Sequence, residues 1–370
     1  MQCVRIGLIG GGMIGSTHAA VLQTIAQAMP DRLELVAVAD PNPQTRETFQ
    51  TIYGWPNAYA DHTALLRDAP VDAVFVCTPT VHHAAIVADV AAAGRHLFCE
   101  KPLAMSLAEA RAMHDAVRRA GVHTQIGLVL RFSAIYWLMR DLLRDPDLGA
   151  PMAVVFRDDQ CFPIRGLHDT RWRADRRQTA GGTLIEHGVH DLDLLTWLFG
   201  PIATLRAWQQ NHAGHDGVED YVAVELAFAS GLRAQLVNVW HDMAQRPSNR
   251  RLEIFCRRGF IASEADMRGD VAVQRGDDAV QITRWPAIHE RFSALLGRNE
   301  HAFADWYGVP YLLQDLSFIE ALLEERDPDP GLDVGVEAQR LAAAVYEAAE
   351  TGAEVDVATF AGGRRSVGAC

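Results

Sequence analysis

Apolar runs of strand length alternate with helix-like stretches over the first 130 residues of the chain. The runs cover residues 4–9, 33–39, 71–77, 96–99 and 123–127. Apolar residues at helical spacing follow the first run at Ala19, Leu22 and Ile25, and similar patterns predict helices over 81–93 and 106–119. Strands that alternate with helices through short connections predict a parallel, doubly wound sheet.

The pattern changes after Pro151. Strand-like runs now follow one another without long helices between them, at 203–209, 218–228, 232–240 and 251–256. Such an order predicts a mostly antiparallel sheet with helices on one face and an open second face. Helical spacing returns over 305–325 and 334–351. We predict an α/β chain with two domains, 1–130 and 131–370, because 370 residues exceed the size at which single cores usually divide.

The charge and the cysteine content of the chain limit its expected partners and its expected cellular compartment. The formal net charge is -13, and no basic run interrupts the acidic chain, which argues against nucleic acid as a partner. The six cysteines lie far apart without a C-x-x-C pair, which favours reduced thiols in the cytoplasm. The sequence shows neither a signal-peptide pattern nor an apolar stretch long enough to span a membrane. We therefore expect a cytoplasmic protein with no membrane partner.

A glycine-rich turn joins the first predicted strand to the first helix. Gly10, Gly12 and Gly15 match the G-x-G-x-x-G motif, with Met13 and Ile14 between the second and third glycines. The first glycine allows a tight turn, the second lets a pyrophosphate approach the backbone, and the third lets helix and strand pack closely. The motif predicts a dinucleotide phosphate at the helix N-terminus. The alternative is a glycine turn that begins a helix for steric reasons alone.

Asp40 ends the second predicted strand, near the spacing of roughly 20 residues at which a ribose-binding acid follows the glycine turn. A carboxylate there accepts hydrogen bonds from the adenosine 2′-hydroxyl and repels a 2′-phosphate. The first basic residue downstream is Arg46. We therefore predict NAD in preference to NADP. The alternative is that Asp40 caps the helix that begins near Pro43.

Glu100, Lys101 and Pro102 end the strand that begins at His96. A lysine at the carboxyl edge of a parallel sheet lies where ligands bind, and its amine can exchange a proton with a substrate hydroxyl. Glu100 beside it would set the charge and position of the amine. Thr78 and Pro79 follow the preceding strand, so we expect them at the same edge, with the nicotinamide end of a dinucleotide between the two loops. The alternative is an exposed lysine on a loop.

Glu186 and His190 are four residues apart on a predicted helix and therefore share one face. A carboxylate beside an imidazole raises the basicity of the ring, which suits His190 to take a proton from a hydroxyl. The alternative for His190 is a packed or capping histidine. His187, Asp191 and Asp193 lie nearby, but a helix spreads them over different faces and no thiolate or third histidine completes a set. We therefore predict no metal site.

Four ordered signatures resemble the Gfo/Idh/MocA oxidoreductases, the family of glucose–fructose oxidoreductase and inositol dehydrogenase. They are the turn from Gly10 to His18, Thr78-Pro79-Thr80-Val81-His82, Glu100-Lys101-Pro102, and Gln125-Ile126-Gly127 with Arg131-Phe132. The resemblance implies that Lys101 is catalytic, that the proline after it commonly follows a cis bond, and that an acid and a histidine four residues later lie beside the lysine. Here the acid is Glu186, where the family has Asp. The chain also departs from the family at Thr80, where Asn is frequent, and at Leu130, where a second Arg is common.

The patterns and the resemblance together give two predicted sets of site residues. Predicted cofactor contacts are Gly10, Gly12, Met13, Ile14, Gly15, Asp40, Thr78, Pro79, His82, Glu100 and Lys101. Predicted substrate contacts are Lys101, Arg131, Trp172, Arg173, Glu186, His187 and His190. Trp172 and Arg173 resemble a Trp-Arg pair of the family, but a solvated basic loop explains them equally well. The resemblance also implies that the C-terminal helices return to the first domain and that the open sheet forms a homodimer or homotetramer.

These predictions converge on an NAD-dependent dehydrogenase that oxidises a secondary hydroxyl of a sugar, an anhydrosugar or a cyclitol. Lys101 and His190 would handle the proton while hydride passes to the nicotinamide. Three alternatives stay open. A glycosidase-type or epimerase-type enzyme would use tightly bound NAD transiently, a reductase would run the same chemistry in reverse, and a regulator would bind NAD without catalysis. The sequence does not indicate which sugar or carbon reacts.

Overall fold

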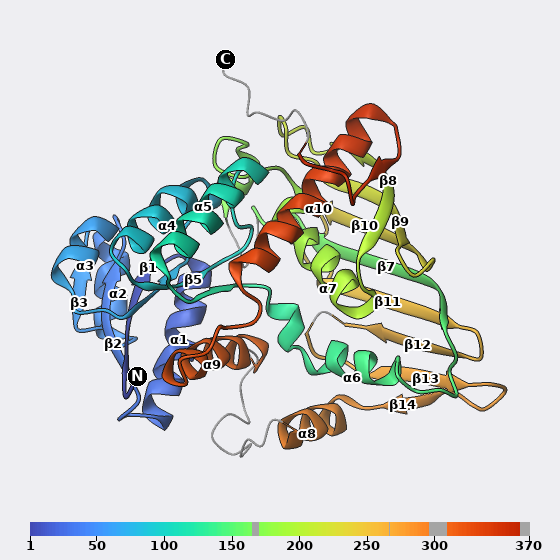
Figure 1. Cartoon of the computed structure of the whole chain (residues 1–370), viewed down its shortest axis with the longest axis horizontal. Coiled ribbons are helices and arrows are strands. Elements are labelled where there is room, and N and C mark those ends of the chain that lie inside the picture. The colour runs from blue at the N-terminus through green and yellow to red at the C-terminus, as the bar shows by residue number, and fades with distance from the viewer. Residues whose placement is uncertain (165–169, 266, 296–308, 363–370) are drawn as a thin grey trace. The chain divides into compact units, whose positions relative to one another are not determined.

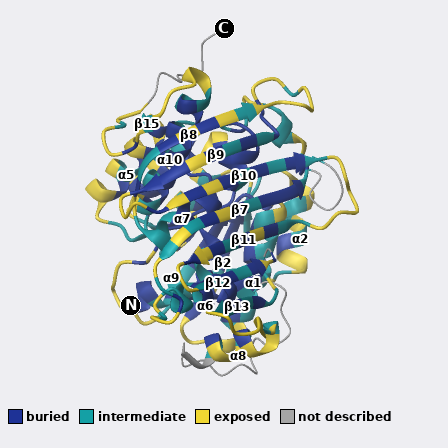
Figure 2. Ribbon diagram, turned by 90° about the vertical axis from the view of Figure 1, so that its right-hand side faces the viewer, coloured by how far each residue is buried: buried dark blue, intermediate teal, exposed yellow. Residues whose placement is uncertain are grey.

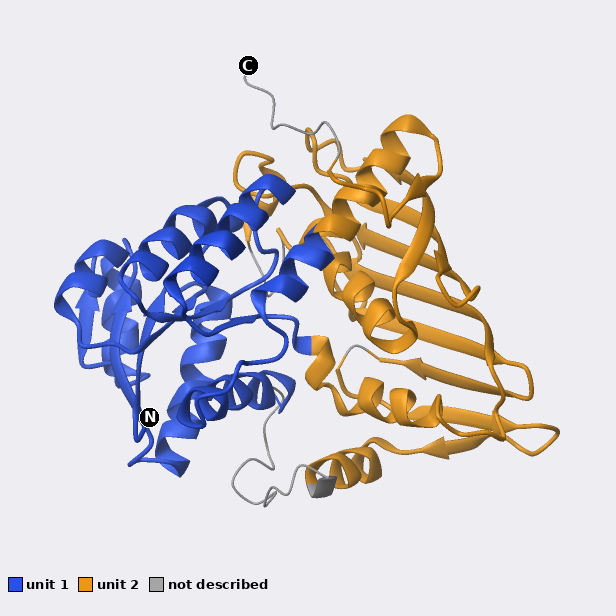
Figure 3. Cartoon of the chain, viewed as in Figure 1, with its two compact units in different colours: residues 1–129, 306–339 blue, residues 130–305, 340–370 orange. Residues whose placement is uncertain are grey.

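The chain divides into two compact units (Figure 3). A computed structural model describes residues 1–164, 170–265, 267–295 and 309–362. The first unit comprises residues 1–129 and 306–339, and the second comprises residues 130–305 and 340–370. Each unit therefore contains two separate stretches of the sequence.

The first unit contains the predicted parallel sheet. Its six strands lie in the order β3-β2-β1-β4-β5-β6, and every neighbouring pair is parallel. The strands are β1 (Val4–Ile9), β2 (Leu33–Ala39), β3 (Asn57–Tyr59), β4 (Ala73–Val76), β5 (His96–Cys99) and β6 (Thr124–Ile126). The order reverses between β1 and β4, so the loops after these strands flank the crevice where such sheets bind ligands. The sequence pattern missed β3, because this strand is short and none of its residues is buried.

Helices cover both faces of this sheet (Figure 1). They are α1 (Met13–Ala28), α2 (Pro43–Thr51), α3 (His62–Asp68), α4 (His83–Ala92), α5 (Leu107–Ala120), α9 (Val309–Leu323) and the first part of α10 (Leu332–Thr351). Local signals set several helix starts. The side chains of Asn42, Asp61 and Ser106 each accept a hydrogen bond from a backbone N–H in the first turn that follows.

Helix α9 completes the core of the first unit although it lies far along the chain. Phe318 of α9 is fully buried, with its ring centroid 5.6 Å from that of Phe75 and 5.9 Å from that of Phe98. The rings of Phe75 and Phe98, on β4 and β5, stack at 4.6 Å. Burying one such side chain contributes roughly 1.5–3 kcal/mol, so the aromatic cluster holds α9 on the sheet. The helix predicted over 305–325 corresponds to α9, and residues 305–308 lie outside the described residues.

The second unit contains a nine-stranded sheet in the order β14-β13-β12-β11-β7-β10-β9-β8-β15. The strands are β7 (Pro151–Cys161), β8 (Ile202–Gln210), β9 (Tyr221–Phe228), β10 (Arg233–His241), β11 (Asn249–Cys256), β12 (Gly259–Glu264), β13 (Val271–Arg275), β14 (Gln281–Thr283) and β15 (Val355–Asp356). Strands β7 and β10 are parallel, and the other neighbouring pairs are antiparallel. The predicted mostly antiparallel sheet is confirmed, and its four predicted strands correspond to β8, β9, β10 and β11.

One face of this sheet is buried and the other is open within the unit. Burial alternates along β10, as the bands of colour in Figure 2 show, because successive side chains of a strand point to opposite faces. Helices α6 (Ala134–Leu142) and α7 (Val189–Phe199) lie along the buried face, and α8 (Trp285–Leu295) follows β14 (Figure 1). The open face carries exposed apolar side chains, including Val155, Trp208 and Phe255.

Candidate active site

The glycine-rich turn after β1 leaves room for an anion at the start of α1. Gly10 has a φ of +93°, which favours glycine, and its N–H donates to the Ala39 carbonyl at 2.9 Å. A side chain at Gly15 would collide with the Gly10 carbonyl, whereas a side chain at Gly12 would meet nothing within 4 Å. The first turn of α1 has no side-chain cap, so its N–H groups are oriented toward an incoming anion. The turn therefore fits the pyrophosphate of a dinucleotide.

Asp40 lies beside this turn, at the carboxyl end of β2. Its Oδ2 accepts a hydrogen bond from the Gly11 N–H at 2.8 Å, and its Oδ1 accepts one from the Asn42 N–H at 2.8 Å. Asn42 is the residue that caps α2, so the alternative that Asp40 caps this helix is wrong. The guanidinium of Arg46 donates to the carbonyls of Asp40 and Pro41, at 2.7 and 3.0 Å. These contacts hold the Asp40 carboxylate against the glycine turn.

A buried histidine joins the loops that follow β4 and β5. His83 has its Nε2 2.9 Å from the Thr78 carbonyl and its Nδ1 3.0 Å from the Pro102 carbonyl. Burial lowers the pKa of His83, so the ring is neutral and donates to one of these carbonyls at a time. The preceding His82, which the sequence suggested as a cofactor contact, is exposed. His83 therefore holds Thr78 and Pro79 beside the Glu100-Lys101-Pro102 loop.

Residues from three of the four sequence signatures lie together at the carboxylate of Glu100. Its Oε2 accepts a hydrogen bond from the backbone N–H of Lys101 at 3.1 Å, and its Oε1 lies 3.0 Å from Nε2 of His18. A side chain at Gly127 would place its Cβ 2.5 Å from Oε1, so only glycine leaves room for this carboxylate. The Lys101–Pro102 peptide is cis, as the resemblance implied. Lys101 itself is half-buried.

His18 is fully buried between two carboxylates. Its Nδ1 lies 2.8 Å from Oδ2 of Asp315 on α9, opposite the contact with Glu100. Burial lowers the pKa of His18, but the charges and hydrogen bonds of Asp315 and Glu100 outweigh burial and raise this pKa to about 10. His18 is therefore an imidazolium at neutral pH.

In the second unit, Glu186 lies in a π-helical turn (Leu184–Gly188) that runs directly into α7. The sequence pattern predicted an ordinary helix here. The Glu186 carboxylate accepts hydrogen bonds from Thr179 Oγ1 at 2.6 Å and from Arg173 Nε at 3.1 Å. The guanidinium of Arg173 also lies over the Trp172 ring, 4.5 Å from its centroid. The alternative of a solvated basic loop is therefore wrong for Arg173. His190 is buried in the first turn of α7.

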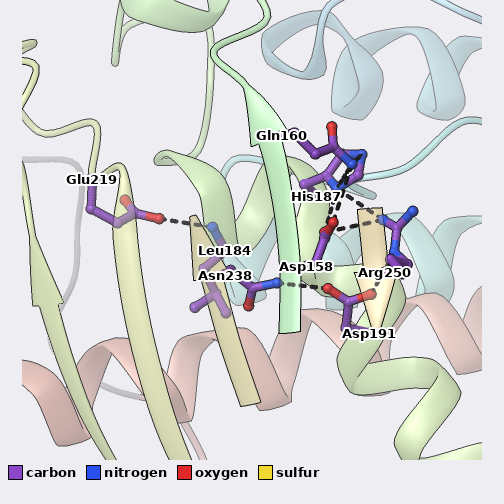
Figure 4. A network of polar contacts seen from close by, with 8 residues as sticks. All are labelled: Asp158, Gln160, Leu184, His187, Asp191, Glu219, Asn238 and Arg250. Atoms are coloured by element: carbon purple, nitrogen blue, oxygen red, sulfur yellow. Dashed lines mark hydrogen bonds and ion pairs between the residues drawn. The ribbon is translucent and has the colours of Figure 1, made fainter. Parts of the chain in front are cut away.

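Glu219 anchors the start of the π-helical turn (Figure 4). Its carboxylate accepts a hydrogen bond from the Leu184 N–H at 3.0 Å, which Figure 4 shows. It also accepts from the Gly182 N–H at 2.7 Å and from the Tyr346 hydroxyl at 3.0 Å. Burial raises the pKa of Glu219, and these hydrogen bonds oppose that shift. A side chain at Gly182 would collide with the Glu219 backbone. Glu219 therefore caps the start of this turn, although it lies in a distant part of the sequence.

A buried ionic network supports the other end of the same turn (Figure 4). Nδ1 of His187 lies 2.6 Å from Oδ2 of Asp158, and Arg250 connects Asp158 to Asp191 at 3.2 and 2.9 Å. Asn238 donates to Asp191 Oδ2 at 2.6 Å. Burial and the nearby Asp158 raise the pKa of Asp191 well above its usual range, and Arg250 opposes this shift. The network joins β7, β10 and β11 to the helical segment that carries Glu186 and His190.

The acidic residues near His190 belong to ion pairs. Arg131 forms a bidentate pair with Asp193, at 2.9 and 2.7 Å, and Asp191 pairs with Arg250. Within the described residues, no group of three His, Cys, Asp or Glu side chains is arranged to hold a metal ion. Across the same residues, no helix is long and apolar enough to cross a bilayer.

Two family models match the chain over both units. An oxidoreductase family model with an NAD-binding Rossmann fold matches residues 4–128, and a GFO/IDH/MocA C-terminal domain model matches residues 136–262. The chain belongs to the Gfo/Idh/MocA family. The resemblance seen in the four signatures is thereby confirmed, and the glycine turn and Asp40 lie in the NAD-binding domain of this oxidoreductase family.

Individual family members are similar along most of their length. An inositol 2-dehydrogenase of Rhizobium meliloti (strain 1021) is 30% identical over 94% of this chain and 97% of its own length. A 1,5-anhydro-D-fructose reductase of Ensifer adhaerens is 32% identical over 84% of this chain and 95% of its own. The solved structure of a levoglucosan dehydrogenase in complex with NADH has a TM-score of 0.84 at 23% identity, and the match covers 96% of this chain and 99% of that one.

The sequence patterns missed several residues that hold the site of this Gfo/Idh/MocA chain in place. His83 shared a detectable signal with Ile86, Val87 and Val90, because these four positions form one buried helical face. His18 was part of a family signature without an assigned partner. The remaining residues act over long sequence distances and carry no local signal: Asp158, Glu219, Arg250 and Asp315.

Replacing Arg250 by Met tests the buried network. The substitution leaves Asp158 and Asp191 buried without their guanidinium, so we expect it to lower the free energy of unfolding by about 3–5 kcal/mol. The neighbouring Arg251 offers a matched control, because it is half-exposed and pairs with Glu253 at 2.9 Å. Arg251→Met is expected to cost about 1 kcal/mol or less. Urea unfolding of both variants measures the difference, and equal costs would contradict a supporting role for the network.

The contacts of His18 with Glu100 and Asp315 predict how the stability of the fold depends on pH. The pKa of His18 rises from its ordinary value of 6.5 to about 10 on folding, so the folded chain binds more protons between these values. The resulting stabilisation is complete below about pH 6.5 and is lost as pH rises through about 10. We therefore expect the urea midpoint of wild type to exceed that of His18→Gln, and we expect this difference to be larger at about pH 6.5 than at about pH 9.5. A gap that stays constant or widens with pH would contradict this assignment.

Proposed function

We propose that this chain is an NAD-dependent dehydrogenase that oxidises a secondary hydroxyl of a sugar, an anhydrosugar or a cyclitol. Relatives named inositol 2-dehydrogenase, 1,5-anhydro-D-fructose reductase and levoglucosan dehydrogenase support this substrate class. All three names describe chemistry at polyol or sugar carbons.

One observation carries the proposal: Lys101 is the single lysine of the chain. The other 33 of its 34 basic residues are arginines. An arginine stays charged in proteins, whereas a lysine amine can lose its proton when its surroundings favour the neutral form. The chain therefore has one side-chain amine for proton exchange, and the lysine that carries it follows β5 at the ligand-binding edge of the NAD-binding sheet.

The proposed roles follow from where each side chain is held. Glu100 fixes the backbone of Lys101, and His83 holds Thr78 and Pro79 beside it. Lys101 and His190 would share the proton of the reacting hydroxyl, and Arg131, Trp172, Arg173, Glu186 and His187 would surround the substrate. NAD bound at the glycine turn would supply the hydride acceptor.

The preference for NAD rests on Asp40. Its carboxylate lies against the Gly11 N–H, where it would accept hydrogen bonds from an adenosine 2′-hydroxyl and repel a 2′-phosphate. The nearby Arg46 guanidinium donates to two backbone carbonyls, which holds it in a structural role. We also propose that the open face of the second sheet, with Val155, Trp208 and Phe255, joins copies of the chain into a homodimer or homotetramer.

Two replacements of Lys101 test the proposed proton transfer. Lys101→Met removes the amine, and Lys101→Arg keeps the charge in the form that the chain uses elsewhere. With NAD and a panel of cyclitols, aldoses and anhydrosugars, NADH absorbance should show turnover reduced by roughly 10²-fold or more in both variants. NAD affinity, measured by calorimetry, should change little. Near-normal turnover of Lys101→Arg would limit the residue to an electrostatic role, and no net NADH from wild type would favour the transient-NAD alternatives.

The cofactor preference is tested by Asp40→Ala. Losing a charged hydrogen-bond acceptor should weaken NAD binding by about 10- to 100-fold and narrow the gap between NAD and NADP. Asp61→Ala is the control, because the Asp61 carboxylate also accepts a hydrogen bond from a backbone N–H, as the N-cap of α3. Dissociation constants for both cofactors should be unchanged in this control. A wild-type chain that binds only NADP would refute the role of Asp40.

A further inference from the structure

We propose that His18 is a positioning residue: held between Glu100 and Asp315, it fixes the Glu100 carboxylate that anchors the backbone of Lys101. The kinetic part of this inference rests on the proposed function, whereas its structural part does not. The three residues come from α1, the end of β5 and α9, so the anchor needs a segment from the last fifth of the chain.

The contacts leave the imidazole little freedom. His18 and Asp315 are 0% exposed and Glu100 is 4% exposed. Both ring nitrogens are engaged, with Glu100 at 3.0 Å and Asp315 at 2.8 Å. The aromatic rings of Phe75, Phe98 and Tyr311 surround the imidazole, with centroids 5.5, 5.1 and 5.9 Å away. The ring cannot rotate without breaking both polar contacts inside an apolar shell.

The proton count of this cluster follows from donor and acceptor chemistry. An ionised carboxylate only accepts hydrogen bonds, and each of the two contacts needs one proton between its partners. The cluster of Glu100, His18 and Asp315 therefore holds two bridging protons and a net charge of about −1. A neutral His18 between two ionised carboxylates would leave one nitrogen facing an oxygen with no proton, which is costly in a buried site.

The second oxygen of Glu100 connects His18 to the proposed catalytic lysine. Oε2 accepts from the Lys101 N–H at 3.1 Å, and Gly127 leaves room for the carboxylate on its other side. Without His18, Oε1 would lose its buried donor, and the carboxylate would turn or take up a proton. Either response would displace the anchor of Lys101. An apolar residue could fill the space of His18, but it could not supply the two donors.

The single lysine allows a direct test. In protein labelled with 13C at lysine Cε, Lys101 gives the one lysine side-chain signal, which can be followed without any substrate. Glu100→Gln should move this signal, and His18→Gln should move it in the same direction. His62→Gln is the matched control, because His62 pairs with Asp89 at 2.9 Å on the surface of α3. A Lys101 signal that stays at its wild-type position in His18→Gln, or in Glu100→Gln, would overturn the proposal.

Kinetics provide a second readout for the same variants. His18→Gln should reduce the turnover number by roughly 10- to 100-fold, because a small displacement of a reacting group is expensive, while KM for NAD stays within about threefold of wild type. A rise in the KM for NAD with unchanged turnover would overturn the proposal. If wild type oxidises no polyol at all, the proposed function fails, and the Lys101 signal still decides the role of His18.

The wild-type chain keeps the proposal testable if His18→Gln does not fold. In protein labelled with 15N at histidine, both ring nitrogens of His18 should carry protons from about pH 6 to about pH 9, unlike those of an ordinary histidine. Asp315→Asn assigns the signal, because it removes one of the two carboxylates. A singly protonated, neutral His18 ring at about pH 8 would overturn the proposal.

Discussion

A buried carboxylate must find hydrogen-bond donors, and the first unit is built around this requirement of Glu100. Its two oxygens are served by the imidazole of His18 and by the backbone of Lys101. The donor from His18 in turn needs a second acceptor, which Asp315 of α9 provides. Gly127 is fixed by the same carboxylate, because a larger residue would occupy its space. Signatures that are scattered along the sequence thus describe one polar contact and the residues that permit it.

The second unit uses the same principle on a different scaffold. Its π-helical turn is held at its start by Glu219 and along its side by the network of Asp158, Arg250 and Asp191. Buried ion pairs add little net stability, because desolvation offsets much of their attraction. They instead fix how the elements are oriented relative to one another, since each carboxylate accepts from donors on more than one element. The segment that carries Glu186 and His190 is therefore tied to the sheet by contacts with fixed geometry.

The sequence predicts the parts of this molecule that are coded locally. Alternation of apolar runs predicted both sheets, and the glycine spacing predicted the turn at which α1 begins. The partners of buried charges could not be predicted in this way. His18 and Glu100 are 82 positions apart, and His18 and Asp315 are 297 apart, so no periodic pattern relates them. The π-helical turn was missed for a similar reason, because strand residues such as Asn238 pack against it and the sequence pattern resembles that of an ordinary helix.

The distribution of basic residues gives these contacts a chemical meaning. Arginine supplies the positive charge in the ion pairs with Asp193, Asp191 and Glu186. Its planar guanidinium suits such bidentate or networked pairing and does not release a proton. The one lysine follows β5, directly after a carboxylate whose two oxygens contact His18 and the backbone N–H of Lys101. In the proposed function, this lysine is the residue that would give up and regain a proton, which an arginine would not do.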